Sequence, residues 1–522
     1  MTIVGSPLES CLPYPDLSVI ELFDRSVERW GDRIALVDGV SGAEYSYSTV
    51  GEVVSLVGRA LQDDGIGPGD CVAIVAGNSP EWIVTFMAAQ AAGAAVTTLN
   101  PLYTSREVRY QLEDSGASAV FAGSATAEAV LEAWEGNEHF YVTTDVWEMA
   151  ERSAGNVAGV AVDPRTDVAA LPYSSGTTGL PKGVMLSHHN LVANVHQLLA
   201  PGPVDDTSVM IDFLPFFHIY GMVGLMTIGF VAGAKQVVMP GFDRELFARL
   251  VTEQQATNLF VVPPVMLELA QGLEGDWSSV RHIQTAAAPV PAHVIETVEQ
   301  VCGAEVYEGY GLTEASPATH STRTGPIRRG TVGRLLPDTR QRVVDMETGA
   351  DLGPGELGEL LVSGPQVMLG YLGSPEATAA AIVEDESGRW LRTGDIVTVD
   401  DEGYVTLRDR AKEMIKYRGY AVAPAELESV LLEHRDIVDA AVVSQSVGGG
   451  DGEIPRAYVV LAEGAEMTDE QVKEHVRARV APFKRIREVE FIDSVPKSPT
   501  GKTLRRELKD RAAVEARSDE EA

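Results

Sequence analysis

The chain has few cysteines for its length. Among 522 residues there are three, Cys11, Cys71 and Cys302, and they lie far apart in the sequence. Their odd number and wide separation exclude a disulfide framework, and no pair has the short spacing typical of a zinc site. The fold must therefore be stabilised by an apolar core, for which a hydrophobic fraction of 45% is ample.

Positive charge is also scarce. The chain carries 41 Lys and Arg against 76 Asp and Glu, which gives a net charge of −35. This balance excludes nonspecific binding to nucleic acid, because the phosphate backbone would be repelled. The basic residues concentrate near the C-terminus, where residues 473–506 contain ten Lys or Arg and four Asp or Glu. An anionic small-molecule ligand is therefore expected to meet this local basic segment.

The sequence has no apolar run long enough to cross a bilayer comfortably. The longest apolar stretch, residues 219–234, is rich in glycine and falls short of the roughly 20 residues that a membrane span needs. We expect it to form a buried helix. The first residues show no basic head followed by an apolar run, which argues against a signal peptide. A cytoplasmic protein without a membrane span is the expectation.

Apolar strands alternate with helices through the first 330 residues. A strand at 71–76, a helix at 80–92 opened by Ser79 and Pro80, and a strand at 95–99 make one β-α-β unit. The alternation continues with predicted strands at 118–122, 209–214 and 259–262 and predicted helices at 189–199, 244–252 and 265–271. This pattern predicts an α/β fold of layered subdomains with mostly parallel sheets.

The pattern of predicted secondary structure changes after about residue 330. Short strands between glycine and acidic turns predict a β-rich layer. Near the C-terminus, predicted helices at 424–433 and 469–480 mix with predicted strands at 440–444, 457–461 and 489–492. We therefore predict a large N-terminal domain at 1–408, a hinge at 409–412 and a small, mobile α+β domain at 413–522.

One loop is rich in glycine and hydroxyl groups. Residues 173–183 read Tyr-Ser-Ser-Gly-Thr-Thr-Gly-Leu-Pro-Lys-Gly and follow an apolar strand. Gly176 and Gly179 let backbone N–H groups approach an anion, and Lys182 adds a positive charge. Because Leu-Pro separates Lys182 from the last glycine, the spacing is not that of a Walker A loop. We interpret the segment as a phosphate-binding loop; a solvated turn is the alternative.

Two further segments are candidates for binding a nucleotide and an acid. In the glycine-rich loop predicted at 307–314, Tyr310 can stack on a purine, and Glu314 can join Thr177 or Thr178 in an oxygen shell around Mg²⁺. An ordinary turn before a helix explains the same residues. His218 lies among aromatic residues and glycines, where a hydrogen-bonded core histidine is the alternative to a catalytic one.

Three more candidates lie in the last third of the chain. Asp395 follows a predicted tight turn, where it can accept the hydroxyls of a ribose or serve an ordinary Asx turn. The charge-alternating segment 408–419 coincides with the predicted domain boundary, although charge runs are often solvated faces. Lys502 follows a Pro and Gly turn, and a solvated lysine is the alternative to a catalytic one.

Together these motifs resemble the superfamily of adenylate-forming enzymes, which includes acyl-CoA synthetases, adenylation domains and firefly luciferase. The resemblance runs from Tyr45-Ser46-Tyr47 to Arg505-Arg506. The glycine-rich loop, the Phe-Phe-His-Ile-Tyr-Gly stretch at 216–221 and Ile-Lys-Tyr-Arg-Gly-Tyr at 415–420 are most similar to 4-coumarate:CoA ligases and bacterial cinnamate:CoA ligase-like enzymes. The resemblance implies an enzyme that uses ATP, Mg²⁺ and coenzyme A to convert an acid to an acyl-adenylate and then to a thioester.

The resemblance also implies roles for individual residues. It assigns catalysis to Lys502, His218, Glu314 and Thr313, the metal to Thr177 and Glu314, and coenzyme A to Arg418 and Gly419. The small domain is expected to rotate about Lys412 between the two half-reactions. The residues implied to bind ATP or AMP are Ser174, Ser175, Gly176, Thr177, Thr178, Lys182, Ala287, Ala288, Glu308, Gly309, Tyr310, Thr313, Asp395, Arg410, Lys412 and Lys502.

The acid is expected to be a small molecule of the cinnamate or 4-coumarate type. The implied acyl pocket, mostly of small residues, comprises Tyr220, Gly224, Ala286, Gly311, Ala318 and Lys416. A medium- or long-chain fatty acid remains an alternative substrate, and a carrier protein remains an alternative acceptor. A non-enzymatic nucleotide-binding protein would be expected to lack Lys502, Glu314 or Asp395, all of which are present.

Two positions depart from the family pattern. Ala421 follows Tyr420 where relatives often have Gln, which removes one contact near the nucleotide. Gly241 stands where relatives often place Lys or Arg against a coenzyme A phosphate. Adenylation is therefore more firmly predicted than the identity of the acceptor. The sequence does not indicate an oligomeric state.

Overall fold

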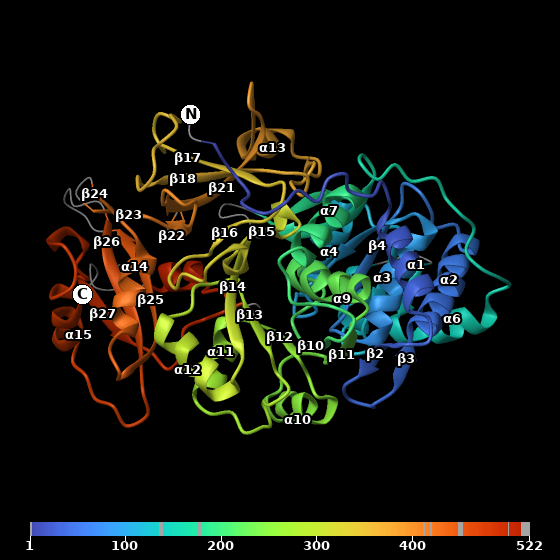
Figure 1. Ribbon diagram of the computed structural model, residues 1–522, viewed down its shortest axis with the longest axis horizontal. Coiled ribbons are helices and arrows are strands. Elements are labelled where there is room, and N and C mark those ends of the chain that lie inside the picture. Colours follow the sequence, from blue (N-terminus) through green and yellow to red (C-terminus); the bar gives the residue numbers. More distant parts are fainter. Residues whose placement is uncertain are drawn as a thin grey trace.

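The computed structural model describes residues 3–134, 139–174, 180–410, 413–417, 420–446, 453–498 and 501–512. Within these ranges three large sheets form the N-terminal part, and a small sheet and a hairpin form the C-terminal part. Figure 1 shows the C-terminal part at the left, beside the edge of the larger body. The predicted α/β class with a small α+β C-terminal domain is confirmed.

The first large sheet has seven strands and carries the glycine-rich loop. Five neighbouring strands are parallel, and the two at one edge are antiparallel. Its members, in spatial order, are β19 (Gly370–Tyr371), β9 (Lys182–Ser187), β8 (Val168–Ser174), β5 (Ala95–Thr98), β4 (Cys71–Val75), β6 (Ala119–Ala122) and β7 (Phe140–Val142). The helices around it include α3 (Pro80–Ala92), α4 (Ser105–Ser115), α5 (Ala127–Ala133) and α6 (Val146–Arg152).

Helix α3 shows how local sequence dictates this layer. The Ser79 hydroxyl accepts the N–H of Trp82 at 3.1 Å, and Pro80 takes the first helical position, where a missing N–H costs nothing. Its residues are apolar on all sides, and nearly all are buried. Inside the core Trp82 stacks on Phe86 with ring centroids 5.6 Å apart. The predicted β-α-β unit is thus confirmed.

The second large sheet has nine strands. In spatial order these are β16 (Arg334–Leu335), β15 (Ala318–Ser321), β14 (Glu305–Gly311), β13 (His282–Thr285), β12 (Asn258–Val261), β10 (Val209–Asp212), β11 (Lys235–Val238), β2 (Ile34–Asp38) and β3 (Glu44–Ser46). The strands from β14 to β2 are parallel, and both margins are antiparallel. Other helices of the N-terminal part are α1 (Val19–Trp30), α2 (Tyr47–Asp63), α7 (His188–Leu199), α10 (Arg244–Gln254), α11 (Pro263–Ala270) and α12 (Ala292–Cys302). One continuous apolar core joins the first two sheets.

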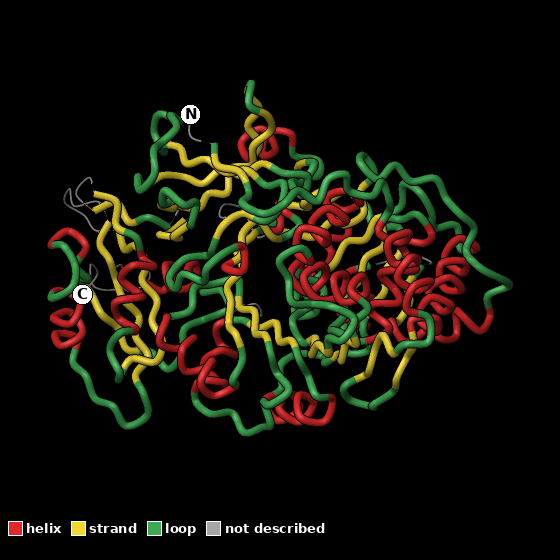
Figure 2. Tube along the Cα trace, in the orientation of Figure 1, coloured by secondary structure: helices red, strands yellow, loops and turns green. Residues whose placement is uncertain are grey.

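The third sheet is the predicted β-rich layer. It contains β1 (Val4–Gly5), β17 (Arg340–Val344), β18 (Gly358–Ser363), β20 (Ile382–Asp385), β21 (Gly388–Val399) and β22 (Val405–Arg410), all antiparallel. Helix α13 (Pro375–Ala381) lies beside it, at the top of the view in Figure 1. Strand β22 leads directly toward the small domain. Figure 2 shows the mixture of strand, helix and loop in each part.

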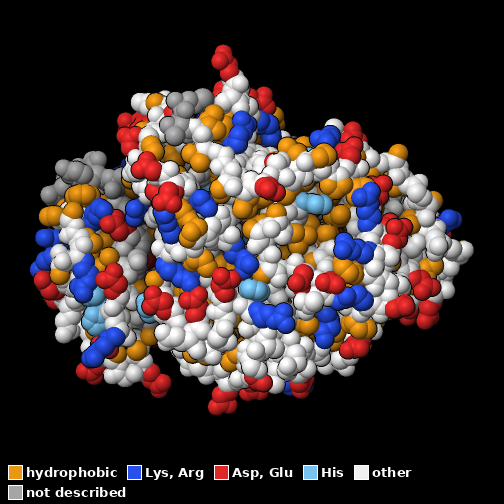
Figure 3. All heavy atoms as spheres, viewed as in Figure 1, with side chains coloured by type: hydrophobic (Ala, Val, Ile, Leu, Met, Phe, Trp, Pro, Cys, Tyr) orange, Lys and Arg blue, Asp and Glu red, His pale blue; other side chains and the backbone are white. Residues whose placement is uncertain are grey.

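The small domain packs helices on a three-stranded sheet. It contains the hairpin β23 (Ile415–Tyr417) and β24 (Tyr420–Val422), the sheet strands β25 (Ile437–Ser446), β26 (Glu453–Leu461) and β27 (Glu488–Phe491), and the helices α14 (Pro424–Leu432) and α15 (Asp469–Arg477). Leu427, Val442, Val459 and Val472 are fully buried in a core of its own. In the face shown in Figure 3, its Lys and Arg side chains stand among acidic ones.

Four segments expected to be irregular or simply helical differ in the structure. Most of the glycine-rich segment 307–314 belongs to strand β14, and the predicted turn before Asp395 lies within the long strand β21. Residues 408–410 of the expected linker are strand β22. The apolar stretch 219–234 is divided into α8 (Ile219–Gly221), a π-helical segment at Met222–Thr227 and α9 (Ile228–Ala232).

The differences in strand assignment arise from pairing that local sequence does not reveal. Strand β14 pairs with β13 and β15, and β21 pairs with β18, β20 and β22. Tertiary pairing of this kind routinely overrides local turn preference. None of the helices in the described part of the chain combines the length and apolar composition that a bilayer crossing requires.

Candidate active site

Asp395 and Arg410 form an ion pair across two adjacent strands. Residue 395 on β21 lies opposite residue 410 on β22, and Arg410 Nε is 3.0 Å from Asp395 Oδ1. The Tyr310 hydroxyl donates to Asp395 Oδ2 at 2.5 Å. Burial raises the pKa of Asp395, while Arg410 and Tyr310 oppose that shift. These contacts bring together three predicted nucleotide residues from two different sheets.

Lys502 reaches the same place from the small domain. Burial of the ammonium and the nearby charge of Arg410 lower its pKa to about 8, while Asp395 and Glu314 oppose the shift. The residue itself is exposed to solvent, so the burial arises from the protein that surrounds the ammonium and not from a sealed pocket. An ammonium within electrostatic range of two carboxylates and one guanidinium is suited to neutralising negative charge that develops nearby.

A close contact between the domains positions Lys502. Gly501 has a φ of +77°, and a Cβ on it would lie 2.8 Å from Pro264 Cδ in helix α11. A side chain at 501 would therefore be strained and would collide with the large domain. The Lys502 N–H donates to Ser498 Oγ at 3.1 Å, which closes the turn. The turn that carries Lys502 is thus seated against the large domain.

Glu314 is connected to the phosphate-binding loop by a tyrosine. The Tyr371 hydroxyl donates to Glu314 Oε1 at 2.8 Å, and Lys182 Nζ lies 5.4 Å from the centroid of the Tyr371 ring. Thr313 and Glu314 occupy a short 3₁₀ turn directly after β14. Ser174 and Lys182 are cross-strand partners at the ends of β8 and β9, so the glycine-rich loop connects an antiparallel pair. Its residues Ser175, Gly176, Thr177 and Thr178 lie outside the described residues.

The predicted adenine residues follow β13 and occupy β14. Ala287 and Ala288 come just after β13, and Ala287 adopts a φ of +77°, uncommon for a residue with a side chain. Glu308 is 8% exposed, its Oε2 has no hydrogen-bond partner within the described structure, and burial raises its pKa to about 7. Gly309 follows it on the strand. The site therefore holds a carboxyl group whose charge changes near neutral pH.

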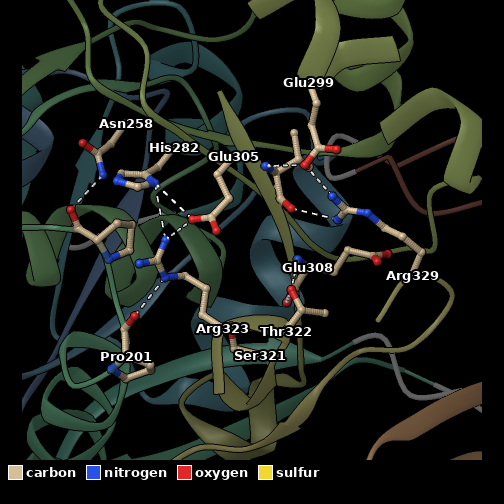
Figure 4. A network of polar contacts seen from close by, with 12 residues as sticks. Pro201, Asn258, His282, Glu299, Glu305, Glu308, Ser321, Thr322, Arg323 and Arg329 are labelled. Carbon is tan, nitrogen blue, oxygen red and sulfur yellow. Dashed lines mark hydrogen bonds and ion pairs between the residues drawn. The ribbon is translucent and has the colours of Figure 1, made fainter. Parts of the chain in front are cut away.

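Two arginines hold the strands behind this carboxyl group, as Figure 4 shows. Arg329 donates to the Val306 carbonyl at 2.8 Å and forms an ion pair with Glu299. Arg323 pairs with Glu305 at 2.7 Å and donates to the carbonyl of Pro201 at 3.0 Å. The positive charge of Arg329 opposes the rise in the pKa of Glu308. Both arginines fix β14, from which Glu308, Gly309 and Tyr310 are presented.

His218 is an uncharged histidine within electrostatic range of Lys502. Burial and the charge of Lys502 lower its pKa to about 4. Its Nδ1 accepts the N–H of Tyr220 at 3.2 Å, which leaves the proton of the neutral ring on Nε2. A neutral imidazole with a fixed donor can bind a carboxylate without taking its proton.

Tyr220 and its surroundings form the predicted acyl region. The Tyr220 hydroxyl is buried without a well-formed hydrogen bond in the described structure, and Gln284 lies next to it. A Cβ on Gly309 would lie 3.1 Å from Gln284 Nε2, so the glycine leaves room for that side chain. Gly224 lies on the π-helical segment, Ala286 follows β13, and Gly311 and Ala318 face each other across β14 and β15.

Family models match most of the chain. An AMP-binding enzyme model matches residues 23–372, and an AMP-binding enzyme C-terminal domain model matches residues 426–502. The chain belongs to the AMP-binding enzyme family. Curated relatives include 4-coumarate–CoA ligase 5 of Oryza sativa subsp. japonica, 37% identical over 94% of both chains, and 4-coumarate–CoA ligase 1 of Petroselinum crispum, 37% identical over 94% of this chain and 93% of that protein.

Solved structures of similar fold cover nearly all of the chain. ATP-bound MatB from Rhodopseudomonas palustris is 28% identical, with a TM-score of 0.87 over 95% of this chain and 99% of that chain. A benzoate CoA ligase from Burkholderia xenovorans LB400 is 27% identical, with a TM-score of 0.85 over 94% of this chain and 100% of that chain. The chain is an ATP-dependent, adenylate-forming acid:CoA ligase, and ATP and coenzyme A are its substrates.

One predicted site residue of this AMP-binding enzyme lies apart from the group around Lys502. Three others are not among the residues that the structure describes. Lys416 is on β23 of the small domain, where its side chain is exposed and its backbone N–H donates to Glu453 at 2.8 Å. No contact of the described residues joins it to the rest of the acyl region. Lys412, Arg418 and Gly419 lie outside the described residues.

Sequence reasoning missed two residues that contact the candidate active site. Tyr371, the partner of Glu314, lies 57 positions further along the chain, on a two-residue strand. Asp409, beside Arg410, looked like part of a solvated charge run but is 8% exposed. The apolar residues Val405 and Leu407 at alternating positions were the available signal that 405–410 is a strand.

Proposed function

We propose that this ligase activates an aromatic acid of the cinnamate or 4-coumarate type. The relatives that are 35–38% identical to it are named 4-coumarate–CoA ligases. The predicted acyl region, apart from Lys416, consists of Tyr220 and small residues, which suits a flat ring. The observation that carries the proposal is that Arg410 pairs with Asp395 at 3.0 Å and that the charge of Lys502 acts on Asp395 and on neutral His218.

In the first half-reaction, an oxygen of the acid attacks the α-phosphorus of ATP. The bond to the bridging oxygen breaks, and pyrophosphate leaves with its electron pair. Asp395 is proposed to accept the ribose hydroxyls, with Arg410 holding its carboxylate in place. Ser174 and Lys182, with the loop between them, are proposed to bind the outgoing phosphates. Ala287, Ala288, Glu308, Gly309 and Tyr310 are proposed to border the adenine.

Lys502 and His218 are proposed to bring the two anions together. The ammonium of Lys502 offsets the repulsion between carboxylate and phosphate as they approach. His218 is proposed to donate from Nε2 to the acid, and its low pKa keeps it a donor that does not compete for the proton. Thr313, in the turn after β14, is proposed to donate its hydroxyl to the α-phosphate.

Glu314 fits a role in binding Mg²⁺. Its carboxylate is partly exposed, and one oxygen is held by Tyr371. Within the described residues, no three His, Cys, Asp or Glu side chains converge on a metal position. This fits a magnesium ion held by one carboxylate, a hydroxyl such as Thr177, water and the phosphates of ATP. When bound, the ion would neutralise phosphate charge.

In the second half-reaction, the thiolate of coenzyme A attacks the carbonyl carbon of the acyl-adenylate, and AMP leaves. Rotation of the small domain about Lys412 is proposed to withdraw Lys502 and to bring Arg418 and Gly419 toward coenzyme A. The boundaries proposed for this motion are 1–408 for the fixed part, 409–412 for the hinge and 413–522 for the moving part.

An assay with purified protein, ATP and Mg²⁺ tests the proposal. Release of AMP is followed with 4-coumarate, cinnamate, benzoate, hexanoate and palmitate, each with and without coenzyme A. We expect the largest kcat/KM with 4-coumarate or cinnamate and full turnover only with coenzyme A. A preference for palmitate or hexanoate would overturn the aromatic assignment. Acid-dependent pyrophosphate release without thioester formation would instead indicate a carrier-protein acceptor.

A further inference from the structure

Asp409 connects the two domains through the start of a helix. It is the second-last residue of β22 and the first residue of the predicted hinge at 409–412, and its strand pairs with β21 of the large domain. Its Oδ2 accepts the N–H of Ala425 at 2.8 Å, and its Oδ1 accepts the N–H of Arg410 at 2.7 Å. Ala425 is the second residue of α14 in the small domain. A carboxylate of the large domain thus caps a helix of the small one, where the helix has unpaired N–H groups.

A second group of the small domain faces the same carboxylate. Arg505 lies close enough to Asp409 for their charges to interact. Its Nη2 also contacts both oxygens of Glu428, at 2.8 and 2.6 Å, and Glu428 Oε1 accepts the N–H of Val442 at 2.8 Å. Arg505 follows Lys502 by three positions, so the same short segment carries both. A fixed Arg505 therefore restricts where Lys502 can lie.

The surroundings of Asp409 make its contact depend on domain orientation. The side chain is 8% exposed, and Ile396 of β21 packs near it against Met414 and Ala423 of the small domain. Burial raises the pKa of Asp409 to about 6, whereas Ala425, Arg505 and Arg410 oppose the shift and Glu428 adds to it. A rotation about Lys412, the proposed pivot, would leave Asp409 paired with β21 while Ala425 and Arg505 move away.

We infer that Asp409 is a positioning residue that holds the small domain in the orientation for adenylate formation, through Ala425 and Arg505. This inference rests on the proposed domain rotation between the two half-reactions. Asp409 does not touch the reacting atoms; it acts by keeping Lys502 seated against them. Its contacts must break before the thioester is made, so they favour the first half-reaction only.

Two substitutions remove the contact from opposite sides. In Asp409→Asn one oxygen becomes an NH₂ group, so the side chain can no longer accept both backbone N–H groups and loses its charge toward Arg505. Ala425→Pro deletes the N–H itself; Pro is tolerated in the first turn of a helix, and α11 of this chain begins with Pro263-Pro264. Asp469→Asn, at an exposed position of α15, is the matched control.

The half-reactions are measured separately. In Asp409→Asn and in Ala425→Pro, we expect acid-dependent ATP–pyrophosphate exchange to fall about tenfold, the effect of losing one hydrogen bond to a charged group. Transfer from synthetic acyl-adenylate to coenzyme A should stay within about twofold of the wild type, because the contact is already broken in the orientation that makes the thioester. The double variant should be no slower than the slower single variant. Equal loss in both half-reactions, loss confined to transfer, or no change would each overturn the inference.

Hydrogen exchange tests the contact without turnover. The Ala425 amide should exchange faster in Asp409→Asn than in wild type or Asp469→Asn, because it loses its acceptor. Unchanged exchange at Ala425 would overturn the inference even if no acid proved to be a substrate. If the wild-type enzyme shows slow hydrogen exchange at Ala425 but no acid-dependent pyrophosphate exchange, the proposed function is refuted. The contact between Asp409 and Ala425 is not refuted by that result.

Discussion

The hydroxyl of Tyr371 donates to Glu314 Oε1 at 2.8 Å, while its ring lies 5.4 Å from Lys182 Nζ. One tyrosine thereby touches the carboxylate proposed for Mg²⁺ and the lysine proposed for the phosphates. Burial and the charge of Glu314 raise the pKa of Tyr371 well above its usual value, so the hydroxyl remains a donor at every working pH. Tyr371 of the first sheet therefore orients Glu314, which lies just after β14 of the second sheet.

Tyr371→Phe should slow adenylate formation by about tenfold, because it removes one hydrogen bond to a charged group. The effect should appear as a weaker apparent affinity for MgATP in pyrophosphate exchange. Tyr141→Phe is a matched control, since the Tyr141 hydroxyl donates to Asp64 at 2.6 Å in another part of the first sheet. A similar loss in both variants would show that the effect is general destabilisation.

Lys502→Ala should reduce acid-dependent pyrophosphate release by at least about 100-fold, the scale expected when a charge-stabilising donor is lost. Transfer of the acyl group from preformed acyl-adenylate to coenzyme A should remain largely intact, because that step occurs after Lys502 has withdrawn. Rapid-quench measurement of each half-reaction checks both expectations. An unchanged rate of pyrophosphate release would refute the role of Lys502.

The adenylation rate should fall as pH rises through about 8. Lys502 is active as an ammonium, and its pKa is lowered to about 8, so the charged form predominates below that pH and is lost above it. A profile of kcat/KM for pyrophosphate exchange between pH 6 and 10 measures this. Lys502→Arg, which keeps its charge throughout that range, should be slower but should lack the decline near pH 8.

Lys412→Pro should impair thioester formation more than adenylation, because a fixed backbone φ restricts rotation at the hinge. The ratio of the two half-reaction rates measures the effect, and the expected change is opposite to that of Asp409→Asn. Equal losses in both half-reactions would count against domain rotation.

Asp212→Asn should change how stability depends on pH. Asp212 is fully buried, its Oδ1 has no partner among the described residues, and burial raises its pKa to about 8. The folded state therefore prefers the neutral acid. The contribution of neutral Asp212 to the free energy of unfolding is complete below the unfolded pKa of about 4 and is lost as pH rises through about 8. The substitution should cost little at pH 5 and raise the midpoint of thermal unfolding by about 2–4 °C at pH 9. A shift of equal size at both pH values would contradict the neutral assignment.

Much of the scaffold could be predicted from local sequence. Helix α3 has the predicted bounds, because Ser79, Pro80 and the following glycine mark both of its ends. The small domain's predicted helices and strands also occur where expected, since their apolar positions have clear periodicity. Lys182, Glu314, Asp395, Arg410 and Lys502 were named from their order in the chain and from the family resemblance.

Residues whose role depends on tertiary contacts could not be predicted in the same way. Tyr371 becomes relevant only because β19 pairs with β9, and Asp409 only because α14 begins beside β22. The strand character of residues 307–311 likewise arises from pairing with β13 and β15. Local sequence shows which groups are present, but the partner of a buried polar group is set by chain segments far away.

The contact of Gly501 with Pro264 offers a way to trap the enzyme in its other state. There is no room for even a methyl group at 501 while the small domain is seated as observed. Gly501→Ala would penalise this one arrangement and leave an arrangement that lacks the contact without that penalty. The Gly501→Ala variant would thus enrich the rotated enzyme for crystallisation. It would need no ligand and would alter no charge.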